Sequence, residues 1–353
     1  MKDFIVVGAA QAGLAMAYYL DKMEVDYLVV DKETEIGASW LNRWDSLKLF
    51  TPSEFNNMPG MQFPAEKGHY PSKTEVAQYF KSYVQKFDIP VRLNTLIESI
   101  THHDDHFLLK SPQGEMRTRN VVIATGPFHI PYTPPFSKKI ASEVFQIHSN
   151  YYKNHDQLQD GKTMVVGAGD SGFQILDEVS EKADDKVYFS GTTDVRVLPQ
   201  EILGKTLWWW FTKTGFLSFS RNSWLGRKLS KSRQPVIGTD VKEILDRENV
   251  EPVGKTKNAE DHKIVTEKKT LTDLKNIIWA TGYRPNFNWI EGLELTKDGY
   301  PKHHRGVSNI DGLYFIGLPW LHTRGSATLG GIKKDAAYLA DYIKQHSLET
   351  ALS

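Results

Sequence analysis

The sequence predicts an α/β fold built from two Rossmann-like dinucleotide-binding units, and three observations support this prediction. A strand, a glycine turn, a helix, a second strand and an acid follow one another between Phe4 and Asp31. The same order returns at 163–190, about 160 residues further on. An apolar strand also runs into an Ala-Thr-Gly turn twice, at 124–126 and at 280–282. Two such units in phase with strands indicate two nucleotide sites rather than chance.

The first unit begins with a β-branched run at 4–7 that is typical of a buried parallel strand. Helical spacing follows at 14–23, and a second strand is expected at 27–30. Between them, Gly8 lets the chain turn sharply and Gly13 lets the helix pack closely on the sheet. The helix N-terminus would then offer unpaired N–H groups to an anionic diphosphate.

Two further residues of this unit bear on nucleotide binding. Asp31 stands where a carboxylate accepts the two hydroxyls of an adenosine ribose. Ala10 occupies the middle glycine position, so a diphosphate must tolerate a methyl group there.

The composition excludes several classes of function. The chain has 353 residues, enough for two domains, and its 43 basic residues balance its 43 acidic ones, which leaves no basic field for nucleic acid. It has no cysteine, which excludes disulfides, thiolate metal sites and dithiol redox chemistry. No apolar run approaches the roughly 20 residues of a membrane span, and the N-terminus enters a strand without a secretory signal. We expect a soluble cytoplasmic protein.

Residues 37–52 break both periodicities and are dense in Trp, Arg and Asp. This composition fits a structured loop held by a cation–π pair. It fits equally well a loop that lies against a flat aromatic cofactor, to which Arg43 and Asp45 would supply charge. Asp45 is therefore either a group that tunes proton transfer or the structural partner of Arg43.

The segment that follows predicts an amphipathic helix at 72–87, capped by Ser72 or Thr74. Strands are expected at 91–93, 107–110 and 121–123. Three histidines and two aspartates lie together at 102–106, but they lack the spacing of a strong metal site, so we expect a solvated hairpin turn.

The second unit contains a full G-x-G-x-x-G turn at 167–172. Within this unit we expect strands at 163–166, 186–190, 251–253, 263–266 and 276–279 and a helix at 173–182, and in the C-terminal part a strand at 312–317 and a final helix at 332–345. The economical pair of cofactors for two such units is a flavin nucleotide and a nicotinamide nucleotide.

Residues 195–237 interrupt the second unit and carry the run Trp208-Trp209-Trp210-Phe211 among scattered Lys and Arg. Three interpretations stay open for this aromatic insertion. It could form an apolar lid or substrate wall, a membrane-surface helix, or ordinary interdomain packing.

Together these landmarks resemble the class B flavoprotein monooxygenases, and most closely a short bacterial branch of flavin-containing monooxygenase-like, cation-efflux-associated oxidoreductases. The resemblance rests on both glycine turns, both Ala-Thr-Gly turns, the Gly-x-x-Trp-x-x-Arg-Trp-Asp stretch at 37–45, Leu-Phe-Thr-Pro at 49–52, and the segment from Leu318 to Ser326. It covers essentially the whole chain.

The resemblance implies FAD on the first unit and NAD(P)H on the second, in a glutathione-reductase-like arrangement with a discontinuous FAD domain. The FAD-binding domain would comprise 1–155 and 286–353. The NAD(P)-binding domain would comprise 156–285, including the insertion 195–237. His148 and Tyr152 match the second half of the family's F-x-G-x-x-x-H-x-x-x-[YF] linker, whereas Ser142 and Val144 replace its Phe and Gly.

The motifs and the resemblance together indicate the site residues. Candidates for cofactor binding are Gly8, Gln11, Ala12, Gly13, Asp31, Lys32, Ser39, Trp40, Arg43, Trp44, Thr125, Gly126, Gly167, Gly169, Asp170, Ser171, Gly172, Ser190, Gly191, Thr192, Thr281, Gly282, Gly317, Arg324, Gly325, Ser326 and Leu329. Candidates for catalysis are Asp45, Arg43, Asn57 and His148. No metal site is expected.

The activity that the resemblance implies is oxygen insertion. NAD(P)H would reduce FAD, and the reduced flavin would capture O₂ as a C4a-(hydro)peroxide that passes one oxygen atom to a small apolar sulfide, amine or ketone. Alternatives are an NAD(P)H:acceptor reductase or NAD(P)H oxidase, and a non-enzymatic redox sensor or efflux-accessory protein with structural FAD. The sequence does not set the oligomeric state; a homodimer is one option.

One departure from the family bears on the choice between NADPH and NADH. The branch commonly has Ser-Gly-Arg after the second strand of this unit, with the Arg on the 2′-phosphate, whereas this chain has Ser190-Gly191-Thr192. Losing that guanidinium removes a charged partner worth about 1.5–3 kcal/mol. Arg196 could compensate.

We therefore predict that the protein accepts NADH beside NADPH, because the strongest 2′-phosphate partner is missing. The measurement is kcat/KM for the two cofactors under identical conditions. A thousandfold preference for NADPH would contradict the prediction.

Overall fold

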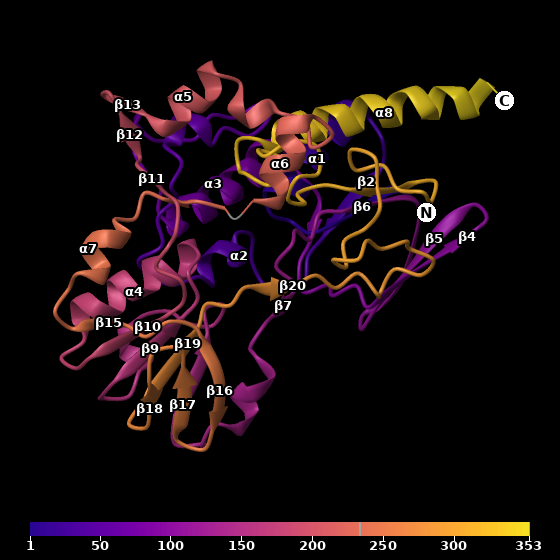
Figure 1. Cartoon of the computed structure of the whole chain (residues 1–353). Helices are drawn as coiled ribbons and strands as arrows, with labels where there is room; N and C mark the ends of the chain where they lie inside the picture. The colour runs from indigo at the N-terminus through magenta and orange to yellow at the C-terminus, as the bar shows by residue number, and fades with distance from the viewer. Residues whose placement is uncertain (233, 353) are drawn as a thin grey trace.

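A computed structural model describes residues 1–232 and 234–352, without the side chains of 225 and 347–352. The chain forms two sheets, a mixed one and a wholly parallel one, each with helices on one face, and the second lies at the lower left of Figure 1. This confirms the predicted α/β fold with two Rossmann-like units.

The first sheet has the strand order β3-β2-β1-β6-β5-β4, and β21 also pairs with β6. Its strands are β1 (Lys2–Val7), β2 (Tyr27–Val30), β3 (Val91–Arg92), β4 (Ser99–His103), β5 (His106–Ser111), β6 (Gly114–Ile123) and β21 (Leu313–Phe315). The pairs among β1, β2, β3, β6 and β21 are parallel, and β4, β5 and β6 form an antiparallel meander. Strand β4 was not predicted. It places the histidines in the β4–β5 hairpin, where His103 faces His106.

Three helices cover one face of this sheet: α1 (Gln11–Lys22), α3 (Lys73–Lys86) and α8 (Ile332–Leu352). The predicted cap of α3 is confirmed for Ser72, which forms a capping box with Glu75. Helix α8 packs along α1 and β21 pairs with β6, so the C-terminal segment returns to the first sheet (Figure 1).

The second sheet is wholly parallel, in the order β15-β10-β9-β19-β8. Its strands are β8 (Phe145–His148), β9 (Thr163–Val166), β10 (Val187–Ser190), β15 (Val250–Pro252) and β19 (Asn276–Trp279). Helices α4 (Asp170–Lys182) and α7 (Val241–Leu245) pack on one face, and a small antiparallel sheet of β16 (Thr256–Glu260), β17 (Lys263–Thr266) and β18 (Thr270–Leu271) packs on the other. Strand β8 is an edge strand of this sheet, although it lies in the segment 1–155 expected for the first domain.

The aromatic insertion folds as short elements at the top of Figure 1. They are β11 (Val197–Leu198), β12 (Glu201–Ile202), β13 (Lys205–Thr206), α5 (Leu207–Lys213), η4 (Phe216–Ser218), α6 (Trp224–Lys231) and β14 (Val236–Ile237). Trp208 is buried, stacks on Phe50 at 5.8 Å and donates its indole N–H to the Phe50 carbonyl at 2.8 Å. Part of the insertion is therefore packing against the segment around Phe50, whereas Trp224 is 70% exposed.

The remaining elements are short: α2 (Ala38–Leu41), η1 (Ser53–Phe55), β7 (Ile130–Pro131), η2 (Pro135–Lys139), η3 (His155–Gln157) and β20 (Tyr283–Arg284). Strands β7 and β20 pair with each other between the two sheets (Figure 1). Within the described residues, no helix has both the length and the apolar character needed to cross a membrane.

Candidate functional site

Each glycine turn is pressed against the Ala-Thr-Gly turn of its own unit. Gly8 has φ +112°, and a Cβ atom there would lie 2.7 Å from the carbonyl oxygen of Ala124. Gly167 has φ +127°, and a Cβ atom there would overlap the carbonyl oxygen of Ala280. Only glycine fits such a left-handed conformation at so close an approach. The pairing of these motifs in the sequence thus has one structural cause.

The last glycine of each turn serves the packing of helix on sheet. A Cβ atom on Gly13 would overlap the carbonyl oxygen of Gly8, and one on Gly172 would overlap that of Gly167. The middle position differs, because a Cβ atom on Gly169 would meet nothing within 4 Å. Gly169 is the N-cap residue of α4, and Ala10 is the N-cap residue of α1. Neither helix has a side-chain hydrogen bond that caps its N-terminus. Both helix N-termini therefore offer donors to a diphosphate, and the residues present fit two dinucleotides.

Asp31 closes the first glycine turn. Its carboxylate accepts the N–H of Ala9 at 2.5 Å and the N–H of Glu33 at 2.9 Å. The neighbouring Lys32 side chain is exposed and lies 3.9 Å from Glu33. The acid thus stands beside the turn as the motif requires; its contact with a ribose stays a prediction.

The C-terminal segment brings a second set of predicted residues to the same turn. A Cβ atom on Gly317 would lie 2.7 Å from the Cβ of Ala12, so the end of β21 abuts the first turn of α1 next to Gln11. Just before α8, a Cβ atom on Gly331 would overlap the carbonyl oxygen of Gly325. Leu329, in the same segment, is buried.

Ser326 organises the loop before α8. Its hydroxyl oxygen accepts the backbone N–H groups of His322 and Thr323, at 3.1 and 2.9 Å. Asp335, in the first turn of α8, is buried, and its Oδ2 has no hydrogen-bond partner among the described residues. Burial raises the pKa of Asp335 to about 6, although a hydrogen bond with Ser326 opposes the shift.

Arg43 and His148 meet at the second Ala-Thr-Gly turn. An Nη1–H of Arg43 donates to the Tyr283 hydroxyl at 2.6 Å. The Nδ1 of His148 accepts the N–H of Asn150 at 3.0 Å, so its Nε2–H donates to the carbonyl of Gly282 at 3.0 Å. Burial lowers the pKa of His148, which favours the neutral ring. Tyr283 and Asn150 were not predicted.

Asp45 lies elsewhere. Its carboxylate is about half exposed, pairs with Lys73 at 2.6 Å and accepts the amide of Asn154 at 2.7 Å, and these bonds lower its pKa. The interpretation of Asp45 as the partner of Arg43 is therefore wrong, since Arg43 donates to Tyr283 and Asn150.

Trp44 belongs to the second unit. It is buried in the cluster that also holds Val165, Phe173 and Ala168 of the second glycine turn. Next to it, Ser46 donates to the buried carboxylate of Glu178 on α4 at 2.6 Å. The stretch expected at a flavin thus anchors the first unit to the second. Ser39 and Trp40, on α2, stay with the first unit, where Trp40 packs on its core.

Asn57 holds a loop in place. Its amide donates to the carbonyl of Glu54 at 3.1 Å and accepts the N–H of Phe63 at 2.8 Å. The adjacent Asn56, which the sequence did not single out, is fully buried and bonds to Thr51. No motif marks Asn56, so burial alone reveals it.

Arg324 reaches toward the second unit. Burial and the charge of Arg196 lower the pKa of Arg324. Burial raises the pKa of Asp170, and the charge of Arg324 opposes that rise. The Asp170 carboxylate also accepts the N–H of Ile237 at 3.1 Å, at the N-terminus of α4 beside Ser171. Arg324, one of the candidates for cofactor binding, thus lies near the second glycine turn.

The two Ala-Thr-Gly turns are linked through the β7–β20 pair. The hydroxyl of Thr125 contacts the ring of His129 at 3.1 Å, across Gly126, which has φ +69°. Thr281 donates to the carbonyl of Tyr132. Both predicted turns are therefore at the junction of the sheets.

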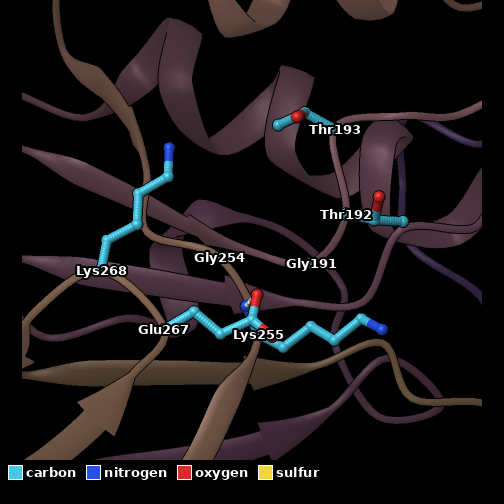
Figure 2. Close-up of a pocket in the computed structure, with 7 residues that line it drawn as sticks. All are labelled: Gly191, Thr192, Thr193, Gly254, Lys255, Glu267 and Lys268. Carbon is cyan, nitrogen blue, oxygen red and sulfur yellow. Dashed lines mark hydrogen bonds between the residues drawn. The ribbon is translucent and has the colours of Figure 1, made fainter.

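Ser190 is the last residue of β10, and Gly191 and Thr192 follow it at the carboxyl end of that strand. The Ser190 hydroxyl bonds to Thr256 at 2.7 Å. Beyond it lies a cavity of about 290 Å³ lined by Gly191, Thr192, Thr193, Gly254, Lys255, Glu267 and Lys268 (Figure 2).

Comparisons with known proteins agree with this arrangement. Residues 5–197 match the model of the family "Pyridine nucleotide-disulphide oxidoreductase". The uncharacterized oxidoreductase CzcO-like of Geobacillus kaustophilus is 42% identical, over 98% of this chain and 99% of its own length. The "probable indole-3-pyruvate monooxygenase YUCCA4" of Arabidopsis thaliana is 30% identical, over 96% and 89%.

A solved structure of similar form is the flavin-containing monooxygenase from Stenotrophomonas maltophilia. It is 25% identical, has a TM-score of 0.78, and the match covers 98% of this chain and 99% of that one. The likeness extends over both sheets and the C-terminal return.

The glycine geometry gives a first prediction from the site. We expect Gly172→Ala to destabilise the protein by about 2 kcal/mol or more, because its methyl group would overlap a backbone carbonyl. Gly169→Ala is the matched control, since its methyl group points into open space and its φ of −105° suits alanine. Thermal unfolding measures both; equal melting temperatures for the two variants would contradict the prediction.

Asp335 gives a second prediction. Its folded pKa is raised, so its contribution to stability is full at low pH, below about 4, and is lost as pH rises through about 6. Asp335→Asn removes the buried charge, so the variant should gain roughly 2–3 kcal/mol relative to the unmodified protein between pH 4 and pH 8. Chemical denaturation at both pH values measures this. Asp341→Asn, at an exposed site of the same helix, is the control; a gain for Asp335→Asn that is the same at both pH values would count against the assignment.

Proposed function

Because this chain belongs to the pyridine nucleotide-disulphide oxidoreductase family, we propose that it is a class B flavin monooxygenase. It binds FAD on the first unit and NADPH, or NADH, on the second. Its reaction inserts one oxygen atom from O₂ into a small apolar sulfide, amine or ketone. The FAD-binding domain comprises 1–155 and 286–353, and the NAD(P)-binding domain comprises 156–285. Strand β8 belongs to the first of these segments but pairs with β19 of the second sheet.

The observation that carries the proposal is the duplication of one phosphate-binding geometry. Gly8 against Ala124 and Gly167 against Ala280 are the same construction at the carboxyl ends of parallel strands in the two sheets. Each is followed by a helix N-terminus without a side-chain cap. Strands β7 and β20 pair between the two sheets, and electron transfer would require the two dinucleotides to meet near this junction.

The absence of cysteine limits which group can accept electrons from a reduced flavin. The family name includes disulphide reductases, but this chain has no thiol to receive electrons from a flavin. Bound FAD supplies hydride acceptance and reaction with O₂; the substrate must then be an external molecule. The similarity to monooxygenases supports oxygen transfer as the outcome.

In this proposal the protein's own residues orient the two nucleotides and shield the reaction site from water. The neutral His148 and the cation of Arg43 hold the second Ala-Thr-Gly turn through Gly282 and Tyr283. We assign both to positioning the two nucleotides rather than to proton transfer. Phe50, Trp208 and Phe211 pack together where the insertion covers the first unit, and such an apolar cover keeps water from a reactive oxygen species.

The test is product analysis. The FAD-loaded protein would be incubated with a thioether, a tertiary amine and a cyclic ketone under ¹⁸O₂, with NADPH or NADH. We expect one ¹⁸O atom in an organic product, detected by mass spectrometry. NADPH oxidation that yields only hydrogen peroxide across the panel would favour the acceptor reductase or oxidase instead. A protein that stays colourless with excess FAD would refute both.

A further inference from the structure

The aromatic insertion is a positive segment in a chain whose formal net charge is zero. Between Ile202 and Thr239 the sequence has seven basic residues and no acidic one. The basic residues are Lys205, Lys213, Arg221, Arg227, Lys228, Lys231 and Arg233. Because the whole chain has 43 residues of each sign, the remainder has seven more acidic than basic residues. The insertion thus has a charge opposite to that of the rest of the protein.

These charges have no partner of opposite sign within the protein. Among the residues that the structure describes, none of the six basic side chains at 205–231 forms an ion pair, and all six are exposed. Lys205 and Lys213 lie over the ring of Trp209, at 5.9 and 5.8 Å from its centroid. Lys228 lies over the ring of Trp224 at 5.7 Å. Exposed cations without a counterion attract an anionic partner.

Helix α6 gathers three of these cations on one face. Four exposed residues follow the i, i+3, i+4, i+7 spacing of a single helix face: Trp224, Arg227, Lys228 and Lys231. The opposite face is held against the protein, because Gly226 is buried and a Cβ atom there would overlap the carbonyl oxygen of Ser220. The packing of α6 therefore turns a tryptophan and three cations outward together.

Two large apolar side chains of the insertion are also in contact with solvent. Leu203, at the tip of the β12–β13 hairpin, is 87% exposed, and Trp224 is 70% exposed. Leu203 has φ +52°, a left-handed conformation that a bulky side chain rarely adopts. Such hairpin turns favour Asn and Gly, so a leucine there is strained as well as exposed. Packing within the chain explains neither position.

The inner side of the insertion is fixed to the rest of the protein. Leu207 and Trp208 are buried, and Phe50 packs against them. The backbone N–H of Arg221 donates to the carbonyl of His322 at 2.7 Å. The insertion thus has a packed apolar inner side and an outer side of cations and exposed apolar residues. This distribution is typical of a segment that lies in a membrane interface.

The exposed apolar residues distinguish between classes of anionic partner. A nucleic acid would compensate the cations, but it offers no apolar environment to an aliphatic side chain such as Leu203. A bilayer of anionic phospholipid offers both phosphate groups for the cations and an interfacial region in which tryptophan is favoured.

We propose that the outer face of the insertion binds the surface of a bilayer that contains anionic phospholipid. Leu203 and Trp224 enter the interfacial region, while the three cations of α6 pair with lipid phosphates. The contact is peripheral, because a helix of eight residues lies in the interface rather than crossing it. The proposal does not rest on the proposed function, since it needs neither a nucleotide nor O₂. For a monooxygenase, it would bring the protein to the phase in which apolar substrates dissolve.

The test is co-sedimentation of the full-length chain with lipid vesicles. One set contains equal parts of phosphatidylglycerol and phosphatidylcholine, and the other contains phosphatidylcholine alone. We expect the protein to bind the anionic vesicles about tenfold or more tightly, and we expect NaCl to weaken this binding.

Two variants separate the electrostatic from the apolar contribution. The triple variant Arg227→Gln/Lys228→Gln/Lys231→Gln should lower binding to anionic vesicles by about fivefold for each charge removed. Trp224→Ser should lower it several-fold at low and at high NaCl alike, because salt does not screen the loss of apolar burial.

The matched control is Lys138→Gln/Lys139→Gln/Lys263→Gln, which removes the same charge from another surface. Lys138 and Lys139 lie in η2 and Lys263 lies on β17, and all three are exposed. Strand β17 is at the bottom of Figure 1, whereas the insertion is at the top. This variant should bind anionic vesicles nearly as tightly as the unmodified protein.

A labelled thiol tests whether the hairpin tip enters the lipid. Because the chain has no cysteine, Leu203→Cys provides a single site for an environment-sensitive dye. We expect its emission to shift to the blue on anionic vesicles, and we expect no shift for the dye on Lys263→Cys.

Three results would overturn the proposal: an unmodified protein that binds neither vesicle, an α6 triple variant that binds as tightly as the unmodified protein, or a control that loses as much binding as that variant. A chain that binds a DNA duplex but no vesicle would assign the surface to nucleic acid instead. None of these results depends on oxygen transfer, so failure here leaves the proposed function untouched.

Discussion

The two nucleotide-binding units depend on one close backbone contact each, between a glycine turn and the Ala-Thr-Gly turn next to it. Gly8 presses on the carbonyl of Ala124, and Gly167 presses on that of Ala280. At each point a side chain would push the turn away from the neighbouring strand and move the helix that follows. Under the proposed function each of these helices directs its N-terminus at a phosphate, so a shift by the width of one methyl group would disturb the binding geometry.

Long-range contacts hold the two units in register. Strands β7 and β20 pair between the sheets, and Arg43 reaches Tyr283, 240 positions away in the sequence. On the other side of the loop, Trp44 is buried in the core of the second sheet. Lys73 pairs with Asp45 at the base of this loop. An element that touches both sheets limits how far they can rotate, so the loop at 43–46 acts as a tether.

The parts of the fold with local causes could be predicted from the sequence. The β-branched runs, the two glycine turns and the helix cap at Ser72 are recognised from neighbouring residues, and the structure confirms them. Features that depend on distant partners could not. Strand β8 was not predicted, because the strand with which it pairs, β19, lies about 130 residues away by sequence position. Asp45 appeared to belong to Arg43 because the two are close in sequence, whereas its partners come from α3 and from Asn154.

The cavity beside Gly191 shows the same limitation. Its lining comes from three segments that are far apart in the sequence, at 191–193, 254–255 and 267–268. The last two meet because the carboxylate of Glu267 accepts the backbone N–H of Lys255, and the small sheet that carries them packs through Ala259, Ile264 and Leu271. A motif confined to one of these segments could not reveal the other two, because the contacts that join them are formed only when the small sheet packs on the second parallel sheet.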